Sequence, residues 1–594
     1  MKRLIALTLT TALAAPATYL SAPPAAAGVV PSCFGSSETT EPPTTNVLVG
    51  TEGPDKLEGT PGRDAIIGMG GADKIFGRGG NDVLCGSSDQ DQADGADTIR
   101  AGAGFDFVIG GKGDDRLFGE GDRDNIFGTA GDDLIDGGSD GGIGDDANYW
   151  YFTDTRDVQA NLATGKAIGQ GTDTLVNIEG LGGSPKNDVL VGNNGANSFD
   201  AMGGNDKIKA GGGTDTLGMT FAESDTFINI TGGTSIGASE GSDSFTGIEN
   251  VIGSSHNDYV TGDGKANGLF GSQGEDTLYG RGGDDVMIGF AGYDSIFGGA
   301  GSADFVSYSD RPDLSVDLNL LSGNVTRDDG NDTLEGVEMV EGSAQADQIT
   351  GDNGPNFFYA DEGNDLIQGN GGSDLVFFLG AGPQGVEVDL STNEARGMAP
   401  NLDELYGIEN LVGSGYADKL VGDGGRNFLN GSDGEDYVEG AGGDDYLAGG
   451  TGDDFIGGGE GSNDLVDFFQ SSKAVSASLS KDKANGEGSD VFEAIESLSG
   501  SGKGDTLEGS SAANSLYGQR GIDKLLGLGG KDRLDGGPKT DTLNGGPSAD
   551  ECHTKDEASA CEKFSRPAEH PLTEVGRRYK KALAAARRYK RRYK

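Results

Sequence analysis

The stretch GGKGDDRLF, residues 110–118, contains the pattern that decides the fold of this chain. A Gly-rich turn ends at Asp115, and the aliphatic residue Leu117 follows two positions later. The same combination occurs nine residues earlier at Asp106 and nine residues later at Asp124. Self-similarity at a fixed short period indicates that one small unit is stacked repeatedly along the chain.

The nine-residue repeat forms six arrays. In the first, the repeats end at Asp55, Asp64, Asp73 and Asp82 and, after an insertion, at Asp97, Asp106, Asp115, Asp124 and Asp133. The period restarts at Asp188, Asp258, Asp347, Asp418 and Asp505, and the second repeat of each restart carries Asn in place of Asp. Nine residues before each restart stands a Glu, namely Glu179, Glu249, Glu338, Glu409 and Glu496. The register therefore extends one repeat back into each connecting segment.

Each repeat reads as six turn residues followed by three strand residues. Two repeats make one coil of two short strands and two turns, so successive coils stack as parallel strands in an all-β solenoid. The connecting segments carry alternating apolar residues, such as Val158, Ala160 and Leu162, which is the period of a half-buried strand. We expect them to be longer-stranded turns that continue the same solenoid.

These patterns predict the following organisation. Residues 1–27 are a signal peptide, residues 28–45 are a linker and residues 562–594 are a basic tail. The six arrays occupy residues 46–146, 179–217, 249–306, 338–376, 409–466 and 496–561, and the last array ends in a Cys cap. The connecting turns occupy residues 147–178, 218–248, 307–337, 377–408 and 467–495.

Stacking places carboxylates 18 residues apart, such as Asp106 and Asp124, directly above one another. Like charges this close are unstable unless a cation lies between them. Carboxylate and carbonyl oxygens suit calcium, which accepts six to eight oxygen ligands in flexible geometry, better than magnesium. The sequence has no His/Cys cluster that would favour zinc. We therefore expect multiple bound calcium ions.

The pattern Gly-Gly-x-Gly-x-Asp-x-aliphatic-x, matched at residues 110–115 and 449–454, resembles the repeats-in-toxin (RTX, haemolysin-type) calcium-binding nonapeptide. The resemblance covers residues 50–552 and implies a right-handed parallel β-roll. The predicted calcium ligands are Asp55, Asp64, Asp73, Asp82, Asp106, Asp115, Asp124, Asp133, Asp206, Asp215, Asp276, Asp285, Asp294, Asp365, Asp374, Asp436, Asp445, Asp454, Asp523 and Asp532. The first Asp of the restarts at 188, 258, 347 and 418 lacks the Gly two residues earlier, as do Asp541 and Asp550.

The composition excludes several other classes of protein. With 109 glycines and one Trp among 594 residues, the chain has little material for a conventional core. Its formal net charge of −53 argues against nucleic-acid binding by the body and would destabilise a compact metal-free chain. Past the N-terminal apolar run, no stretch is long and apolar enough to predict a membrane span.

The two ends of the chain carry export and capping signals. A basic start, an apolar run over residues 4–20 and small residues at 25–27 predict a secretory signal, with a retained N-terminal anchor as the alternative. The four cysteines favour the disulfides Cys33–Cys85 and Cys552–Cys561 in an exported chain, with thiol metal ligands as the alternative. The basic tail is either solvated charge or a segment that contacts anionic wall polymer or the acidic roll.

Two functions follow from these observations. The first is a secreted or cell-surface protein whose roll folds on binding extracellular calcium, with a structural, adhesive or envelope-interaction role; its partners would be calcium and envelope polymers or another surface protein. The second is an extracellular enzyme, a hydrolase or epimerase, acting on a polymer with calcium as a structural ion. The three His residues lie outside any His-Glu-x-x-His motif, and no catalytic residues are predicted.

Overall fold

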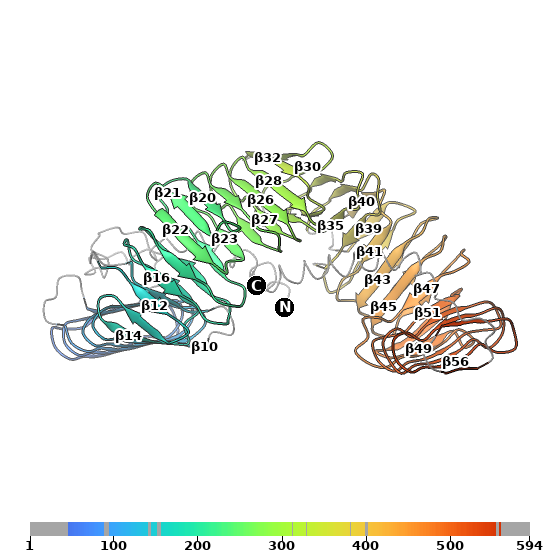
Figure 1. Ribbon diagram of the computed structural model, residues 1–594, viewed down its shortest axis with the longest axis horizontal. Helices are drawn as coiled ribbons and strands as arrows, with labels where there is room; N and C mark the ends of the chain where they lie inside the picture. The colour runs from blue at the N-terminus through green and yellow to red at the C-terminus, as the bar shows by residue number, and fades with distance from the viewer. Residues whose placement is uncertain are drawn as a thin grey trace. The chain divides into compact units, whose positions relative to one another are not determined.

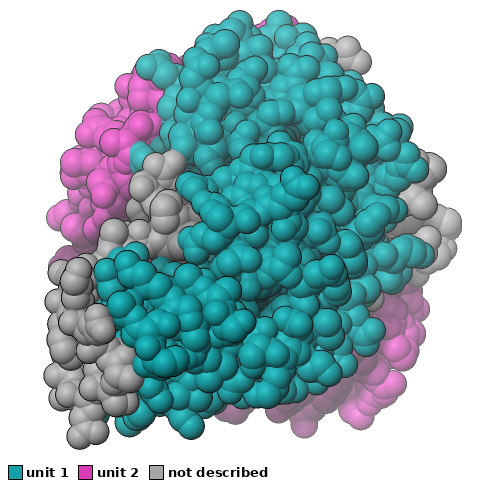
Figure 2. Space-filling view, turned by 90° about the vertical axis from the view of Figure 1, so that its right-hand side faces the viewer, with its two compact units in different colours: residues 1–10, 301–594 teal, residues 11–300 magenta. Residues whose placement is uncertain are grey.

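The computed structural model describes residues 46–87, 94–139, 144–150, 156–311, 313–327, 330–360, 362–379, 382–397, 402–553 and 557–559. Within these ranges, all regular secondary structure is β-strand. In the same residues no helix has the length and hydropathy needed to cross a membrane. The described residues up to 300 and those from 301 onward form two compact units (Figure 2).

In the first array, successive strands alternate between two sheets, here named sheet A and sheet B. Figure 1 shows the short strands of each unit, joined by turns. Sheet A holds β1 (Asn46–Val49), β3 (Asp64–Met69), β5 (Val83–Ser87), β7 (Phe107–Lys112), β9 (Asn125–Ala130) and β11 (Asp146–Asn148). Sheet B holds β2 (Lys56–Glu58), β4 (Lys74–Gly79), β6 (Thr98–Ala103), β8 (Arg116–Gly121) and β10 (Leu134–Ser139). Neighbouring strands within each sheet are parallel.

The aliphatic residue of each repeat forms the core between the two sheets. Ile99 pairs in register with Leu117, and Leu117 with Ile135, so one column of aliphatic side chains runs along the inside of sheet B. All three side chains are fully buried. In the other unit, Leu411 and Leu429 continue the same pattern in sheet A. The predicted all-β parallel roll is therefore confirmed.

The rest of the unit up to residue 300 repeats this plan. Its sheet A strands are β15 (Gly180–Gly182), β17 (Ser198–Asp200), β19 (Thr216–Gly218), β23 (Asn250–Ile252), β25 (Gly268–Phe270) and β27 (Val286–Ile288). Its sheet B strands are β16 (Val189–Val191), β18 (Lys207–Lys209), β24 (Tyr259–Thr261), β26 (Thr277–Gly282) and β28 (Ser295–Ala300), with β12 (Gln159–Asn161), β13 (Lys166–Ile168), β14 (Thr172–Val176), β20 (Thr226–Asn229), β21 (Thr234–Gly237) and β22 (Gly241–Thr246) from connecting segments.

The unit from residue 301 is built in the same way. Its sheet A strands are β29 (Phe305–Ser307), β33 (Met339–Glu341), β35 (Phe357–Tyr359), β37 (Leu375–Phe377), β41 (Asn410–Val412), β43 (Phe428–Asp433), β45 (Tyr446–Thr451), β47 (Leu465–Asp467), β51 (Ser497–Ser499), β53 (Ser515–Tyr517), β55 (Arg533–Asp535) and β57 (Glu551–His553). Its sheet B strands are β34 (Gln348–Thr350), β36 (Leu366–Gln368), β42 (Lys419–Val421), β44 (Tyr437–Glu439), β46 (Phe455–Gly457), β52 (Thr506–Glu508), β54 (Lys524–Leu526), β56 (Thr542–Asn544) and β58 (Glu557–Ser559). Its connecting segments supply β30 (Asp317–Asn319), β31 (Asn324–Arg327), β32 (Gly330–Glu335), β38 (Glu387–Asp389), β39 (Glu394–Arg396), β40 (Leu402–Tyr406), β48 (Ser476–Ser478), β49 (Lys483–Asn485) and β50 (Ser489–Glu493).

The connecting segments add a feature that the apolar alternation does not predict. β12 continues the parallel sheet with β16, but it also pairs antiparallel with β13, which in turn pairs antiparallel with β14. β14 then returns to the parallel stack beside β10. The segments do continue the solenoid, and each one adds a short antiparallel strand to sheet B.

Candidate metal-binding turns

Inside the arrays, the Asp that ends a repeat is buried although it carries a carboxyl group. Asp106, Asp115 and Asp124 are at most 1% exposed. The Oδ1 atom of Asp124 accepts a hydrogen bond from the backbone N–H of Asp106 at 2.9 Å, one coil earlier, and Oδ1 of Asp133 accepts the equivalent bond from Asp115 at 2.8 Å. One carboxylate oxygen of each such Asp therefore joins successive coils.

The other oxygen, Oδ2, has no donor in most repeats, and the backbone of these turns shares one feature. The residue four positions before the Asp has a left-handed φ, such as +113° at Gly111 and +78° at Glu120. We call a turn with both properties an open turn. The open turns are those ending at Asp73, Asp82, Asp106, Asp115, Asp124, Asp133, Asp206, Asp215, Asp276, Asp374, Asp436, Asp445, Asp454, Asp523, Asp532 and Asp550.

The first Gly of the motif leaves space in front of this free oxygen. A Cβ atom added to Gly110 would lie 2.5 Å from Oδ2 of Asp115 and 2.8 Å from the carbonyl oxygen of Gly128 in the next coil. Two oxygen atoms from successive coils therefore converge beside a residue that has no side chain. Any larger residue would occupy the space toward which both oxygens are directed.

The electrostatics of the open turns disfavour a bare carboxylate. Burial raises the pKa of Asp115 to about 8, with the charges of Asp133 and Asp97 adding to the effect. Burial and the neighbouring charge of Asp106 raise the pKa of Asp124 to about 9. A cation held at these oxygens would reverse both effects, because it would favour the ionised carboxylates.

The oxygen donors of an open turn fit calcium. Among the described residues, no three or more His, Cys, Asp or Glu side chains are grouped so that they could hold a metal ion, so backbone carbonyls such as that of Gly128 would supply the remaining ligands beside Asp115. Calcium is the biological dication that best tolerates such a set, because its coordination number and geometry are flexible. A bound ion would neutralise the carboxylates and link neighbouring coils.

The structure divides the predicted ligands into three groups. Fifteen of them end open turns, all of those named above except Asp550. Asp285, Asp294 and Asp365 are buried, and their Oδ1 atoms make the coil-to-coil bond. Asp55 and Asp64 differ, because their Oδ2 atoms accept hydrogen bonds of 2.6 Å from the backbone N–H groups of Thr51 and Thr60.

Three carboxylates that sequence reasoning did not select share the free Oδ2 atom. They are Asp97, Asp464 and Asp550. Insertions shift Asp97 and Asp464 away from the nine-residue spacing, and Asp550 lacks the Gly two residues earlier. The aliphatic residue two positions later, Ile99 or Val466, is the signal that could have found the first two.

A second kind of turn begins each restarted array, and we call it a capped turn. The backbone N–H of the residue four positions before Asp or Asn donates to its side chain, so no carboxylate oxygen is left without a donor. The capped turns at the restarts pair Ser184, Ser254, Ser343, Ser414 and Ser501 with Asp188, Asp258, Asp347, Asp418 and Asp505. In the Asn repeats, Asn193, Asp263, Asp352, Asp423 and Ser510 donate to Asn197, Asn267, Asn356, Asn427 and Asn514.

The Glu residues that precede the restarts occupy the same register as the Asp residues. Oε2 of Glu179 accepts a hydrogen bond of 3.0 Å from the backbone N–H of Asp145, and Oε2 of Glu249 accepts one of 3.0 Å from Asp215. The longer Glu side chain thus makes the coil-to-coil bond in the connecting segments.

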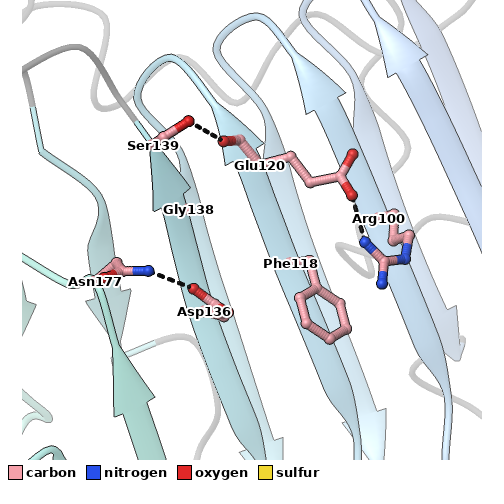
Figure 3. Close-up of a pocket in the computed structure, with 7 residues that line it drawn as sticks. All are labelled: Arg100, Phe118, Glu120, Asp136, Gly138, Ser139 and Asn177. Carbon is pink, nitrogen blue, oxygen red and sulfur yellow. Dashed lines mark hydrogen bonds and ion pairs between the residues drawn. The ribbon is translucent and has the colours of Figure 1, made fainter.

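A depression on sheet B offers a second candidate site, shown in Figure 3. Arg100 donates to Oε1 of Glu120 at 2.5 Å, and its guanidinium group lies 4.4 Å from the centre of the Phe118 ring. Asn177 donates to Oδ1 of Asp136 at 3.0 Å. These polar groups bind one another and thereby stabilise the surface of the sheet. The depression therefore gives no support to the enzyme hypothesis.

Two of the four cysteines lie within the described residues. Cys85 on β5, in the unit up to residue 300, and Cys552 on β57, in the unit from residue 301, are buried. Their predicted partners, Cys33 and Cys561, lie outside the described residues, as do the predicted signal peptide and the basic tail. Both disulfide pairings therefore stay predictions.

Comparison with protein-family models gives one match along the chain. The model described as RTX calcium-binding nonapeptide repeat (4 copies) matches residues 44–68, 58–93, 91–126, 182–217, 252–287, 270–302, 341–376, 406–438, 430–465, 490–525, 499–533 and 526–555, which together are more than half of the chain. No curated protein matches the chain. The matched residues include the Asp that ends each open turn described above, except Asp133.

Proposed function

Because the chain belongs to the RTX calcium-binding nonapeptide repeat family, we propose that its roll folds on binding extracellular calcium and serves a structural or adhesive role outside the cell. The observation that carries this proposal is the series of buried Oδ2 atoms without donors in successive coils. Each is a desolvated carboxylate oxygen that a calcium ion would satisfy.

The coupling of folding to calcium follows from charge. The metal-free chain carries a formal net charge of −53, and folding it buries carboxyl groups in stacked turns. Repulsion and desolvation both oppose that state. Calcium ions bound in the open turns would remove both costs. The free energy of calcium binding would then contribute directly to the free energy of folding. Extracellular calcium modules bind at roughly 0.1–1 mM, which would make the external medium the signal to fold.

A calcium titration of the full chain followed by circular dichroism tests this proposal. We expect little strand signal in chelator and a cooperative rise as calcium approaches millimolar concentration. The same titration with magnesium is the control, because magnesium keeps its water ligands and requires an octahedral site. Identical spectra in chelator and in millimolar calcium would contradict the proposal.

The extracellular role depends on export, which the N-terminal residues 1–27 predict. We propose that the disulfides Cys33–Cys85 and Cys552–Cys561 close the two ends of the roll, where a stack lacks a neighbour on one side. The partner would be an envelope polymer or another surface protein. Cell fractionation and peptide mapping without reduction test export and the two pairings separately; reduced cysteines in the exported chain would contradict the pairings.

A further inference from the structure

Two successive turns on the same edge of the roll begin with the same residues and adopt opposite states. Residues 413–418 read GSGYAD and residues 431–436 read GSDGED, one coil apart. In the first, the N–H of Ser414 donates to Oδ2 of Asp418 at 2.5 Å, and its Oγ–H donates to Oδ1 at 2.8 Å. In the second, Ser432 has a left-handed φ of +83°, and Oδ2 of Asp436 is buried without a donor. The Ser therefore does not decide the state.

The residue two positions before the Asp distinguishes the two turns. Gly434 has a φ of +151°, and a Cβ atom there would lie 2.5 Å from the carbonyl oxygen of Tyr416 in the preceding coil. Its N–H donates to the carbonyl of Thr451 in the next coil at 2.9 Å. At the equivalent position Tyr416 has a side chain, and its N–H turns back to Oγ of Ser414 at 3.1 Å. In the open turn of these Ser-bearing repeats, a side chain at this position would therefore meet the backbone of the preceding coil.

The same pair of states occurs independently in the other unit. Residues 253–258 read GSSHND and residues 271–276 read GSQGED. The N–H of His256 donates to Oγ of Ser254 at 3.0 Å, and the turn is capped. Gly274 has a φ of +131° and donates to Ala291 at 3.0 Å, and Oδ2 of Asp276 is buried without a donor.

The remaining Ser-bearing restart turns also combine a side chain two positions before the Asp with the capped state. Their residues at this position are Lys186, Gln345 and Lys503, and all three turns are capped. The capped carboxylate needs no cation, as Asp418 illustrates: Oδ1 accepts hydrogen bonds from Val386 and Ser414, and Oδ2 accepts one from Ser414. An N–H directed at Oδ2 also places a positive hydrogen where a metal ion would have to lie.

We propose that, in the Ser-bearing turns, the residue two positions before the Asp selects between a metal-binding turn and a capped turn, so that the five restart carboxylates are hydrogen-bonded supports and not calcium ligands. They are Asp188, Asp258, Asp347, Asp418 and Asp505. This inference rests on the proposed calcium function. Each restarted array then begins with a capped coil that needs no calcium, and metal binding starts in the following coil.

Calcium counts on matched variants of the full chain test the rule. One variant combines Lys186→Gly, His256→Gly, Gln345→Gly, Tyr416→Gly and Lys503→Gly; the control carries Ala at the same five positions. Calcium per chain is measured by equilibrium dialysis and elemental analysis at saturating calcium. We expect the Gly variant to bind up to five more ions than the parent chain and the Ala variant to bind the parent number. Equal counts in the two variants would overturn the rule.

Location of the ions in crystals of the unmodified chain gives a second test that does not depend on the variants folding. Anomalous diffraction should show calcium beside Oδ2 of Asp276 and Asp436 and none beside Oδ2 of Asp258 and Asp418. Ions at all four positions would overturn this inference and leave the proposed function intact. Absence of ions from both kinds of turn would contradict the proposed function and this inference with it.

Discussion

The backbone N–H of Asp115 donates to Oδ1 of Asp133 at 2.8 Å, although the two residues are 18 positions apart. The same arrangement joins Asp106 to Asp124. One oxygen of each carboxylate therefore holds the stack together, and the other is left for a ligand. Fold and binding site are thus built from the same side chains, so a change in one of them affects both.

Replacing Asp115 by Asn should separate these two roles. The amide oxygen can still accept the coil-to-coil bond, but the charge offered to the metal is lost. We expect stability in saturating calcium to fall by about 1.5–3 kcal/mol, the scale of a hydrogen bond or contact to a charged group, and stability in chelator to be unchanged or higher. Denaturant unfolding in both media measures this. Asp317→Asn, at an exposed position on β30, is the control, and an equal loss in it would contradict the assignment.

The metal-free roll should lose stability as the pH rises. The pKa values of Asp106 and Asp115 are raised to about 8 in the folded chain, and that of Asp124 to about 9, from the ordinary Asp value of 3.8. The folded state therefore binds more protons than the unfolded state between these limits. These three carboxyl groups therefore stabilise the metal-free folded state fully below about pH 4, and their contribution is lost as the pH rises through 8 to 9.

Circular dichroism in chelator across this range checks the pH prediction, with strand signal decreasing toward pH 9. Calcium binding requires the ionised carboxylates, so the apparent calcium affinity should rise with pH and protons should be released on binding. If the chain in chelator were more ordered at pH 9 than at pH 5, these carboxyl groups would not be the groups that dominate the pH dependence of its stability.

The Gly at the start of an open turn should be intolerant of a side chain. In Gly110→Ala the new Cβ would lie 2.5 Å from Oδ2 of Asp115, in the space assigned to the ion. We expect a loss of about 1–3 kcal/mol in saturating calcium, typical of overpacking, together with a lower calcium count. Gly264→Ala is the matched control, since a Cβ there meets no atom within 4 Å. Similar calcium counts and stabilities for the two variants would argue against a site beside Gly110.

The aliphatic column should carry much of the stability of the calcium-bound roll. Leu117 is fully buried between Ile99 and Ile135, so Leu117→Ala should cost about 2–5 kcal/mol through lost contacts and the cavity it leaves. Ile168→Ala, at a side chain that is 54% exposed, should cost much less. Denaturant unfolding in saturating calcium compares the two. Equal losses would mean that this column does not form a packed core.

Much of the candidate site could be predicted from the sequence because the repeat is local. A turn that ends at Asp115 with Leu117 two positions later specifies both the buried column and the carboxylate edge, and the 18-residue coil follows from two repeats. The nine-residue spacing did not select Asp97 and Asp464 as ligands. Insertions precede both residues, so their distance along the chain no longer corresponds to their position in the stack. Alternation at Val158, Ala160 and Leu162 predicted a strand, but period two carries no information on whether the next strand is parallel.

The sequence by itself determined the coil, its aliphatic core and the oxygen chemistry of its edges, since these depend on residue types at fixed spacing. Only the tertiary structure decided which carboxylates keep a free oxygen. Ser414 and Ser432 are the same residue in turns of the same length, yet one caps its Asp and the other does not. The difference arises where Gly434 packs against the backbone of Tyr416 in the preceding coil, a contact between residues 18 positions apart that excludes a side chain.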